Sequence, residues 1–343
     1  MVGSEHLLGI IMAGGRGTRL MPLTKNRPKP MVPILGRPVI DYVKDAMVAA
    51  GLSEIVVTTG YQGEQLVSHV ESWNTKSRVN QEDTPMGTAG SVKLLSEELK
   101  ETFVVGSGDS VASFDIQDLL SSHRKSGAKV TMALWEVDDP TEFGIVGLSS
   151  TQEGDVDSSL SEGYISKFKE KPTQEEAFSN LINAGLYIIE PEVMELVPPG
   201  EKYDFSKQLF PDVLARGWPM FAKTVNGIWF DVGHPFELHK AQMTLIERRD
   251  ELPFPMPSGE VLPDGSFISD SASVSGHISR SVILAGSSVN GAAVNSVVMA
   301  NSRINGVSES SVIGENSIID SRIHNCVIGD ESHIVIDLEN EKR

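Results

Sequence analysis

The sequence has almost no cysteine and no long apolar segment. Cys326 is the single cysteine among 343 residues, which excludes a disulfide within the chain. No run approaches the length of a membrane span, about eighteen apolar residues, and residues 1–5 lack the basic start and long apolar middle of a secretory leader. These absences favour a cytoplasmic protein. We expect Cys326 to pack in the interior and not to act as a nucleophile.

Positive charge is also scarce. The chain has 29 Lys and Arg against 47 Asp and Glu, a formal net charge of −18, which argues against a sequence-independent grip on nucleic acid. Phosphate substrates are still compatible with this charge, because local cations and bound Mg²⁺ decide the field inside a cleft. A content of 40% hydrophobic and 22% charged residues is typical of a globular protein, and the length suggests two domains.

A glycine loop followed by several cations is the most informative feature that is present. Gly14, Gly15 and Gly17 come directly after an apolar strand and let main-chain N–H groups approach phosphate oxygens. The pattern fits neither a Walker loop nor a dinucleotide fingerprint, since Thr18 and a proline-broken stretch follow the glycines. We expect the loop to hold phosphates, surrounded by the charges of Arg16, Arg19, Lys25, Arg27 and Lys29.

Residues 7–247 alternate short apolar runs with helical ones, which predicts an α/β, Rossmann-like domain with a mainly parallel sheet and helices on both faces. Strands are predicted at 8–13, 54–59, 103–106 and 130–136. Helices are predicted at 39–50, 63–73, 89–99 and 116–126, and a polar hairpin tip or loop at 149–163. Pro253, Pro255, Pro257 and Pro263 mark a linker. The predicted domains are therefore 1–248, a linker at 249–265, and 266–343.

Residues 266–340 contain five repeats of fifteen residues that align without a gap. The third position of each repeat is β-branched, and so is the second after Phe267 in the first repeat. This pattern predicts a β-solenoid, in which like residues stack in a continuous column. Because the second and third rows are adjacent, one of them should point out of the column, where it could pair with a partner subunit.

Two aspartates are candidate metal ligands. Asp109 follows an apolar strand, at the strand end where open α/β sheets bind ligands, and Asp231 lies in the segment 227–235. Mg²⁺ is usually held by one or two carboxylates together with substrate phosphates. Asp109 and Asp231 would provide those carboxylates if the fold brings them together.

Residues 81–90 are the candidate base-binding segment. Gly87 would let a base lie against the main chain, and Thr88 opens a helix. Either Gln81 or Glu82 could face the base: a carboxylate suits the donors of guanine, whereas an amide suits uracil or thymine. The sequence leaves this choice open.

The ordered motifs resemble those of the sugar-1-phosphate nucleotidyltransferases. They are Gly-Thr-Arg-Leu, Pro-Leu-Thr and Pro-Lys-Pro in the glycine-loop segment, Gly-Ser-Gly-Asp at 106–109, Glu-Lys-Pro at 170–172, Asn-Ala-Gly at 183–185 and the segment around Asp231, with the solenoid behind them. Within the family, Pro-Lys-Pro-Met-Val-Pro and Pro-Met-Gly-Thr-Ala-Gly are most similar to the mannose-1-phosphate guanylyltransferases.

The resemblance implies a left-handed solenoid and Mg²⁺-dependent transfer of a nucleotidyl group from a nucleoside triphosphate to a sugar 1-phosphate, with GTP and mannose 1-phosphate giving GDP-mannose. From the outward row of the solenoid we also expect a homo-oligomer formed through it. The resemblance also implies the roles of individual residues, which fall into four groups. The catalytic cations are Arg19, Lys29 and Lys171. The nucleotide-binding residues are Ala13, Gly14, Gly15, Gly17, Thr18, Gln81, Glu82, Gly87 and Thr88. The sugar-binding residues are Gly144, Glu170, Asn183 and Gly185, and the metal ligands are Asp109 and Asp231.

Three alternatives stay open at this point. The substrate pair could be that of a glucose-1-phosphate thymidylyl- or uridylyltransferase. The chain could be a non-catalytic regulatory subunit that binds nucleotide sugars, although such subunits tend to lose the arginine, lysine or aspartates that are all present here. The solenoid could also be an acyltransferase, although five short turns leave little room for a coenzyme A cleft.

Overall fold

The computed structural model describes residues 7–60, 63–252 and 254–343. Residues 1–5, which bear on the leader prediction, and Pro253 of the linker lie outside the described residues. The chain divides into two compact units that cross the predicted domain boundaries. The first comprises Met1–Gly14, Val43–Gly108 and Ala112–Trp229, and the second Gly15–Tyr42, Asp109–Val111 and Phe230–Arg343. The solenoid therefore shares a unit with residues 15–42, whereas Gly14 of the glycine loop belongs to the first unit.

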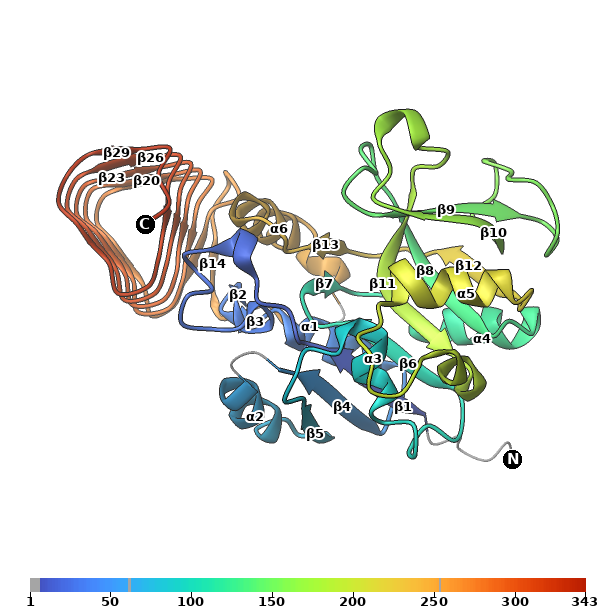
Figure 1. Cartoon of the computed structure of the whole chain (residues 1–343). Helices are drawn as coiled ribbons and strands as arrows, with labels where there is room; N and C mark the ends of the chain where they lie inside the picture. The colour runs from blue at the N-terminus through green and yellow to red at the C-terminus, as the bar shows by residue number, and fades with distance from the viewer. Residues whose placement is uncertain (1–6, 61–62, 253) are drawn as a thin grey trace. The chain divides into compact units, whose positions relative to one another are not determined.

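The first unit is built on a nine-stranded sheet in the order β5-β4-β1-β6-β11-β8-β12-β10-β9 (Figure 1). The sheet is mixed: β1, β4, β5 and β6 are mutually parallel, and β10 and β11 run against the other strands. The strands are β1 (Leu8–Met12), β4 (Glu54–Thr59), β5 (Lys76–Gln81), β6 (Phe103–Ser107), β8 (Val130–Glu136), β9 (Gly144–Ser149), β10 (Glu162–Glu170), β11 (Leu181–Ile189) and β12 (Met220–Thr224). The four predicted strands are confirmed, and residues 149–163 connect the antiparallel pair β9 and β10 as expected.

The predicted helices are also present, with one shorter than expected. They are α1 (Ile40–Ala49), α2 (Gly63–Glu71), α3 (Gly87–Lys93) and α4 (Ile116–Ser126), followed by α5 (Phe210–Ala215). The prediction that α3 reaches residue 99 is wrong. The Ser96 hydroxyl donates to the carbonyl of Lys93 at 2.6 Å, and the following turns bond three residues apart, which ends the helix. None of the described helices is long and apolar enough to cross a bilayer.

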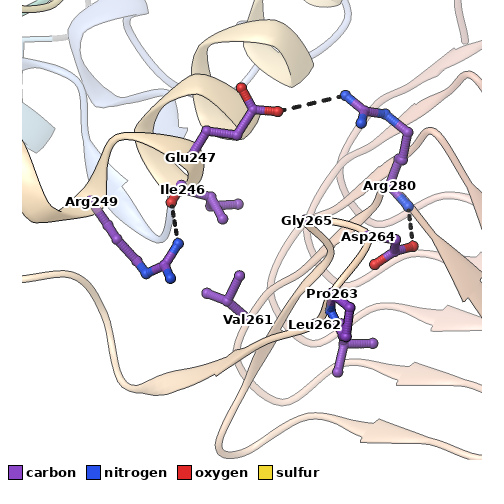
Figure 2. Close-up of a pocket in the computed structure, with 9 residues that line it drawn as sticks. All are labelled: Ile246, Glu247, Arg249, Val261, Leu262, Pro263, Asp264, Gly265 and Arg280. Carbon is purple, nitrogen blue, oxygen red and sulfur yellow. Dashed lines mark hydrogen bonds and ion pairs between the residues drawn. The ribbon is translucent and has the colours of Figure 1, made fainter.

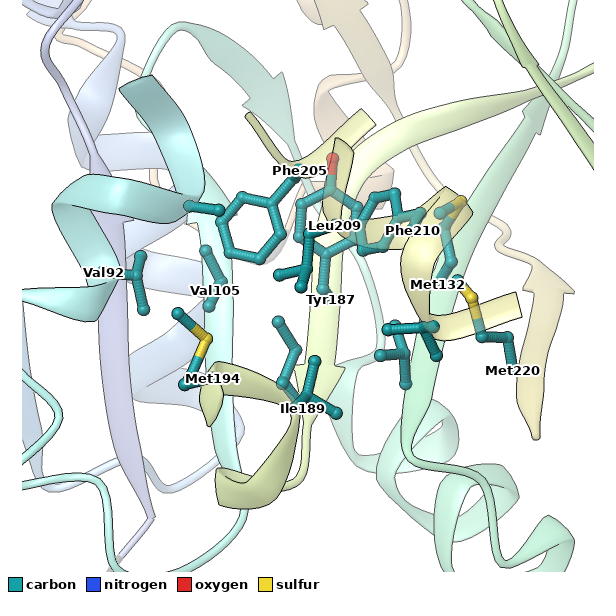
Figure 3. Close-up of a cluster of buried hydrophobic side chains, with 14 of the residues drawn as sticks. Val92, Val105, Met132, Tyr187, Ile189, Met194, Phe205, Leu209, Phe210 and Met220 are labelled. Atoms are coloured by element: carbon teal, nitrogen blue, oxygen red, sulfur yellow. The ribbon is translucent and has the colours of Figure 1, made fainter. Parts of the chain in front are cut away.

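An aromatic cluster fixes the segment after β11 against the sheet (Figure 3). Tyr187 of β11 packs on Phe205 and Phe210, with ring centroids 5.4 and 5.0 Å apart. Phe205 begins a π-helix, Phe205–Leu209, that runs directly into α5. Burying these rings against the sheet holds residues 204–207 beside the ends of β10 and β11, where candidate sugar-binding residues lie.

The second unit contains the solenoid, whose three parallel sheets stack with a register of fifteen residues (Figure 1). The sheets follow repeat positions 2–3, 8–9 and 12–14, beginning with β15 (Phe267–Ser269), β16 (Ser273–Val274) and β17 (His277–Ser279). The third-position residues Ile283, Val298, Ile313 and Ile328 lie inside the column, together with Val289 and Ile304 from the ninth position. This arrangement confirms the predicted solenoid and its column of β-branched side chains.

The second-position row lies on the other side of the same strands and is also buried. Val282, Val297, Val312 and Val327 are at most 1% exposed. Helix α6 (Pro235–Glu247) packs against β18 (Val282–Ile283) and β24 (Val312–Ile313), so the chain itself contributes to covering this face. The hypothesis that one of the two rows pairs with a partner subunit is therefore wrong. Oligomerisation through another part of the solenoid stays a prediction.

Serine ladders satisfy the backbone at the corners of the solenoid. The Ser266 hydroxyl accepts from the Ser281 amide at 3.1 Å, and the same contact repeats from turn to turn until Ser311, which accepts from the Cys326 amide at 3.0 Å. Cys326 is fully buried at the next position of this column, which agrees with a packing role. Within the predicted linker, β14 (Gly259–Val261) pairs antiparallel with β15.

Candidate active site

Lys29 lies between the two candidate metal ligands. Its ammonium Nζ is 2.5 Å from Asp109 Oδ2 and 3.2 Å from Asp231 Oδ1, and the lysine side chain is only 8% exposed. The aspartates meet because β7 (Ser110–Ala112) pairs with β13 (Trp229–Asp231), and the Val232 amide donates to the Asp109 carbonyl at 3.3 Å. The predicted proximity of Asp109 and Asp231 is thus present. Two carboxylates facing one cation also form an oxygen donor pair of the kind that Mg²⁺ prefers.

Arg19 adds a second cation to this group. A Cβ at Gly233 would lie 2.9 Å from Asp231 Oδ2 and 3.3 Å from Arg19 Nη2, so the missing side chain leaves room for both groups. Arg19 lies in the 3₁₀ turn Thr18–Leu20 that follows the glycine loop. We call Arg19, Lys29, Asp109 and Asp231 the charge cluster.

Burial and neighbouring opposite charges shift the pKa values of Lys29 and Asp231 in opposite directions. Burial by itself lowers the pKa of Lys29, but the negative charges of Asp109 and Asp231 outweigh it and raise the pKa, so Lys29 stays an ammonium. Burial raises the pKa of Asp231, Lys29 opposes that rise, and the like charge of Asp109 adds to it. The cluster therefore keeps a proton on Lys29 and carries concentrated charge of both signs.

The glycine loop is packed onto Lys29. Gly17 has φ 63°, and a Cβ there would lie 2.9 Å from Cβ of Lys29 and 3.0 Å from Cγ2 of Thr24. The Thr24 hydroxyl donates to the Gly17 carbonyl at 2.7 Å, which closes the loop. By contrast, a Cβ at Gly15 would meet no atom of the described residues within 4 Å. Gly17 therefore shapes the loop, whereas Gly15 leaves the backbone open to a ligand.

Arg27, one of the cations predicted to surround the phosphate-binding loop, pairs with carboxylates of the solenoid instead. Arg27 Nη2 donates to Glu315 Oε2 at 2.8 Å and also bonds Asp330 Oδ2, both in the solenoid. The expectation that Arg27 surrounds the loop with charge is wrong, because two carboxylates already neutralise it. Sequence reasoning missed this contact because the partners are 288 and 303 residues away along the chain.

In the first unit, Glu82 rather than Gln81 faces the glycine segment. Glu82 Oε1 would lie 3.6 Å from a Cβ at Gly14, and Glu82 Oε2 accepts from the Ser91 hydroxyl at 2.7 Å. The Gln81 side chain lies instead against Gly63, 3.1 Å from the position of a Cβ there. Ala13 precedes this region and donates its amide to the Thr58 carbonyl at 2.8 Å. Glu82, and not Gln81, is thus the side chain directed toward Gly14, and base binding by either residue stays a prediction.

Gly87 and Thr88 both make contacts within the protein that explain why these residue types stand at these positions. Gly87 has φ 75°, and a Cβ there would lie 2.6 Å from the carbonyl oxygen of Tyr203. The backbone of Tyr203 therefore excludes a side chain at this position, and the approach of a base to the main chain of Gly87 stays a prediction. Thr88 Oγ1 bonds Asp204 Oδ2 at 3.0 Å and accepts from the Phe205 amide at 2.9 Å. Both residues tie α3 to the segment that follows Tyr203.

Glu170 is the last residue of strand β10, and Lys171 follows it. A Cβ at Gly144 would lie 2.8 Å from Glu170 Oε2, so this glycine makes room for the Glu170 carboxylate, and its contact with a sugar stays a prediction. Burial raises the pKa of Glu170, and the nearby charge of Asp204 raises it further. Lys171 has φ 44°, an unusual conformation for a residue with a side chain, and its exposed ammonium is 3.5 Å from Glu142 Oε2.

Asn183 and Gly185 of β11 complete the candidate sugar-binding group. Asn183 Nδ2 donates to Tyr187 Oη at 2.8 Å and to Ser206 Oγ at 3.3 Å, and Asn183 Oδ1 accepts from the Gly185 amide at 2.9 Å. Gly185 has φ 76°, and a Cβ there would lie 3.0 Å from Cβ of Ser107. These contacts hold the Asn183 amide in a fixed orientation.

Asp204 and Ser206 are polar residues that sequence reasoning missed. Asp204 caps the π-helix by accepting from the amides of Ser206 and Lys207, bonds Thr88 and acts on the charge of Glu170. Ser206 contacts Asn183. An aspartate just before Phe205 is a local helix-start signal, but its role in joining three predicted residues depends on tertiary contacts. In the first unit, the segment 204–206 thus links Thr88, Glu170 and Asn183.

A cavity of about 530 Å³ in the second unit contains none of the predicted site residues (Figure 2). It is lined by the end of α6, residues 261–265 and Arg280. The Arg280 amide donates to Asp264 Oδ2 at 2.9 Å, and Arg249 donates to the Ile246 carbonyl at 3.1 Å. The cavity therefore shares no lining residue with the charge cluster.

A charge cluster of two cations and two carboxylates, next in sequence to an open glycine loop, can bind phosphates, so fold and site define a nucleotide-using α/β enzyme. The chain belongs to the nucleotidyl transferase family, which it matches over residues 8–248. The predicted nucleotidyltransferase and its resemblance to the sugar-1-phosphate nucleotidyltransferases are thereby confirmed.

Curated relatives and a solved structure agree with this family. The chain is 32% identical over 276 residues to a mannose-1-phosphate guanyltransferase of Eremothecium gossypii, covering 78% of this chain and 73% of that protein. It is 34% identical to the Candida albicans mannose-1-phosphate guanyltransferase, covering 66% of this chain but only 61% of that protein. It is also 31% identical to a UTP–glucose-1-phosphate uridylyltransferase of Synechocystis, covering 65% and 59%.

The fold comparison is independent of those alignments. A structure described as a glucose-1-phosphate thymidylyltransferase from Bacillus anthracis in complex with sucrose matches with a TM-score of 0.60 at 23% identity. The match covers 69% of this chain and 94% of that chain. It supports the nucleotidyltransferase fold and, at this identity, nothing finer.

Proposed function

We propose that the protein transfers a guanylyl group from GTP to mannose 1-phosphate, giving GDP-mannose and pyrophosphate with Mg²⁺ as the cofactor. The observation that carries the reaction class is the charge cluster: Lys29 and Arg19 beside Asp109 and Asp231. The choice of guanine is supported by Glu82, a carboxylate that can accept from two donors on the edge of that base. The choice of mannose is supported by the relatives named as mannose-1-phosphate guanyltransferases.

The proposed chemistry needs positioning and charge neutralisation more than proton transfer. The sugar phosphate is already ionised, so its oxygen attacks the α-phosphorus in line while pyrophosphate leaves from the opposite side. Arg19 and Lys29 bind the triphosphate and stabilise the oxygens that gain charge. Lys171 orients the attacking phosphate, and Glu170 and Asn183 accept hydrogen bonds from hydroxyls of the sugar.

The donor set of the cluster fits Mg²⁺, which would be held by Asp109 and Asp231. When bound, the ion would neutralise phosphate charge. The part that the chain itself plays is to keep both carboxylates in place through Lys29. Isothermal titration with Mg²⁺ in the presence of a non-hydrolysable GTP analogue tests this role directly: binding should weaken in Asp231→Asn and stay unchanged in the surface variant Asp118→Asn.

The substrate test is a matrix of four nucleoside triphosphates against mannose, glucose and N-acetylglucosamine 1-phosphates, read as released pyrophosphate. GTP with mannose 1-phosphate should be the most active pair, and Glu82→Gln should reduce the preference for GTP over UTP by about tenfold or more. Highest activity with glucose 1-phosphate and UTP or dTTP would establish the alternative transferase. Nucleotide-sugar binding without any turnover would establish the regulatory subunit.

A further inference from the structure

The segment between the glycine loop and Lys29 is held by the solenoid through one arginine. Arg27 lies two residues before Lys29, and its side chain is 14% exposed. Its guanidinium bonds Glu315 at 2.8 Å and also Asp330, whose side chain is 9% exposed. A guanidinium shared by two carboxylates is a directional contact with little freedom, in contrast to an exposed single ion pair.

The receptor for Arg27 is itself ordered. Asp330 Oδ1 accepts from the Glu315 amide at 2.8 Å, which leaves Oδ2 for the arginine. A Cβ at Gly314 would lie 2.6 Å from Asp330 Oδ1, so glycine is required beside this carboxylate. Pro22 of the same loop segment packs on the solenoid as well: a Cβ at Gly329 would lie 3.1 Å from Pro22 Cβ.

The solenoid repeat changes character where these contacts occur. At the fourth and fifth repeat positions the first turn carries Ser269-Asp270, and the second and third turns carry Leu284-Ala285 and Met299-Ala300. The last two turns carry Gly314-Glu315 and Gly329-Asp330 at the same positions. A large buried side chain and an alanine are thus replaced by a glycine and a carboxylate in the two turns that contact the loop, whereas a solenoid that only stacked on itself would have no need for this change.

We propose that Arg27 is a positioning residue: by clamping the segment 22–29 to Glu315 and Asp330, the solenoid fixes Arg19 and Lys29 for the triphosphate. The loop transmits the constraint, because Thr24 bonds Gly17 and Gly17 packs on Lys29. Arg27 itself makes no contact with phosphate, since its charge is neutralised by the solenoid. The proposal rests on the proposed function and gives the solenoid a part in the reaction beyond subunit contact.

The first test compares hydrogen exchange in the free full-length protein. The wild type, Arg27→Gln and the double variant Glu315→Gln/Asp330→Asn are compared with Arg248→Gln, which breaks an exposed arginine–glutamate pair elsewhere. Residues 15–30 should exchange at least about tenfold faster in both clamp variants and at the wild-type rate in Arg248→Gln. This readout needs no substrate, so it stands or falls separately from the proposed function.

The second test is kinetic and uses the same variants with the most active substrate pair. Arg27→Gln and the double variant should each lower kcat/KM for the triphosphate by about tenfold to a hundredfold. Combining them should cost little more, because both remove the same clamp. The KM for the sugar phosphate should change less, and Arg27→Lys should recover part of the loss.

Unchanged loop exchange together with unchanged kcat/KM in the double variant would overturn the proposal. So would an additive loss in the combined variant, since that would mean that Arg27 acts on the reaction without the solenoid. Failure of the wild type to turn over any substrate pair would refute the proposed function and leave the exchange result valid for the clamp.

Discussion

The solenoid interior and the charge cluster belong to the same unit but are stabilised in opposite ways. The solenoid buries β-branched side chains and serine hydroxyls, and the buried serine hydroxyls named above bond neighbouring turns. The charge cluster places two carboxylates beside a lysine that is 8% exposed, with part of the cost of burial visible in the raised pKa of Asp231. Neutral, repeated contacts serve stability, whereas partly buried opposed charges are retained where phosphates have to be bound. Substitutions in the solenoid interior should therefore change mainly the free energy of unfolding, and substitutions in the charge cluster mainly the activity.

The largest effect on stability is expected inside the column. Ile313→Ala removes a fully buried side chain from the middle of the stack and should lower the free energy of unfolding by about 3 kcal/mol. Turnover per folded molecule should stay close to wild type. Urea unfolding and pyrophosphate release measure the two quantities, with Ile318→Ala at a half-buried position of the next strand as the matched control. Equal losses of stability in both variants would contradict the assignment of the inner row.

The opposite pattern is expected for the charge cluster. Asp109→Asn should lower kcat/KM by about 10²-fold, because it removes a proposed metal ligand and a partner of Lys29, while unfolding changes little. Steady-state kinetics over a range of Mg²⁺ concentrations should also show a higher Mg²⁺ requirement. Asp118→Asn, which alters a surface ion pair with Lys223, serves as control. Wild-type kinetics in Asp109→Asn would show that the Asp109 carboxylate takes no part in the reaction.

A smaller loss is expected when a serine ladder is broken. The Ser296 hydroxyl accepts from the buried Ser311 amide at 3.2 Å, and Ser296→Ala leaves that amide without its partner. The free energy of unfolding should fall by about 1–3 kcal/mol, the cost of an unsatisfied buried group. Ser273→Ala, at an exposed position of the solenoid, should change it by less than about 0.5 kcal/mol. If the two variants unfold alike, the ladder is not a source of stability.

The smallest expected effect is a pH-dependent change in melting temperature caused by Glu170. The raised pKa of Glu170 means that the folded state gains relative stability below the ordinary glutamate pKa and loses it as pH rises through the raised value. Glu170→Gln cannot ionise, so at pH 7 it should melt slightly higher than wild type while its KM for the sugar phosphate rises. The difference in melting temperature should vanish near pH 4, below about 4.3 where glutamate is protonated in both states. A difference that is constant from pH 4 to pH 8 would exclude ionisation as its cause.

The solenoid was predictable because its evidence is periodic. Fifteen-residue spacing places Ile283, Val298 and Ile313 in register without any knowledge of the rest of the chain. The row next to them could be predicted to point outward, but not to be covered by α6, since that contact joins two segments with separate patterns.

Individual site residues were predictable, but their partners were only partly so. Asp109 stands out after an apolar strand and Asp231 in the segment 227–235, yet only the pairing of β7 with β13 brings both to Lys29. Gly87 was expected to admit a base, but nothing local predicts that the backbone of Tyr203 excludes a side chain there. Arg27 reads as one more cation near the loop, because nothing local marks its carboxylate partners in the solenoid. Long-range polar contacts leave little trace in local spacing, so they had to be found in the structure.

The central claim is that Arg19, in the charge cluster beside the glycine loop, stabilises the charge that develops on the phosphates during the transfer. Pyrophosphate release by Arg19→Ala, measured beside wild type on protein shown by circular dichroism to be folded, tests it most directly. A loss of about 10²-fold or more in kcat is predicted, because Arg19 would stabilise charge that develops in the transition state. Turnover close to that of the wild type would contradict the account.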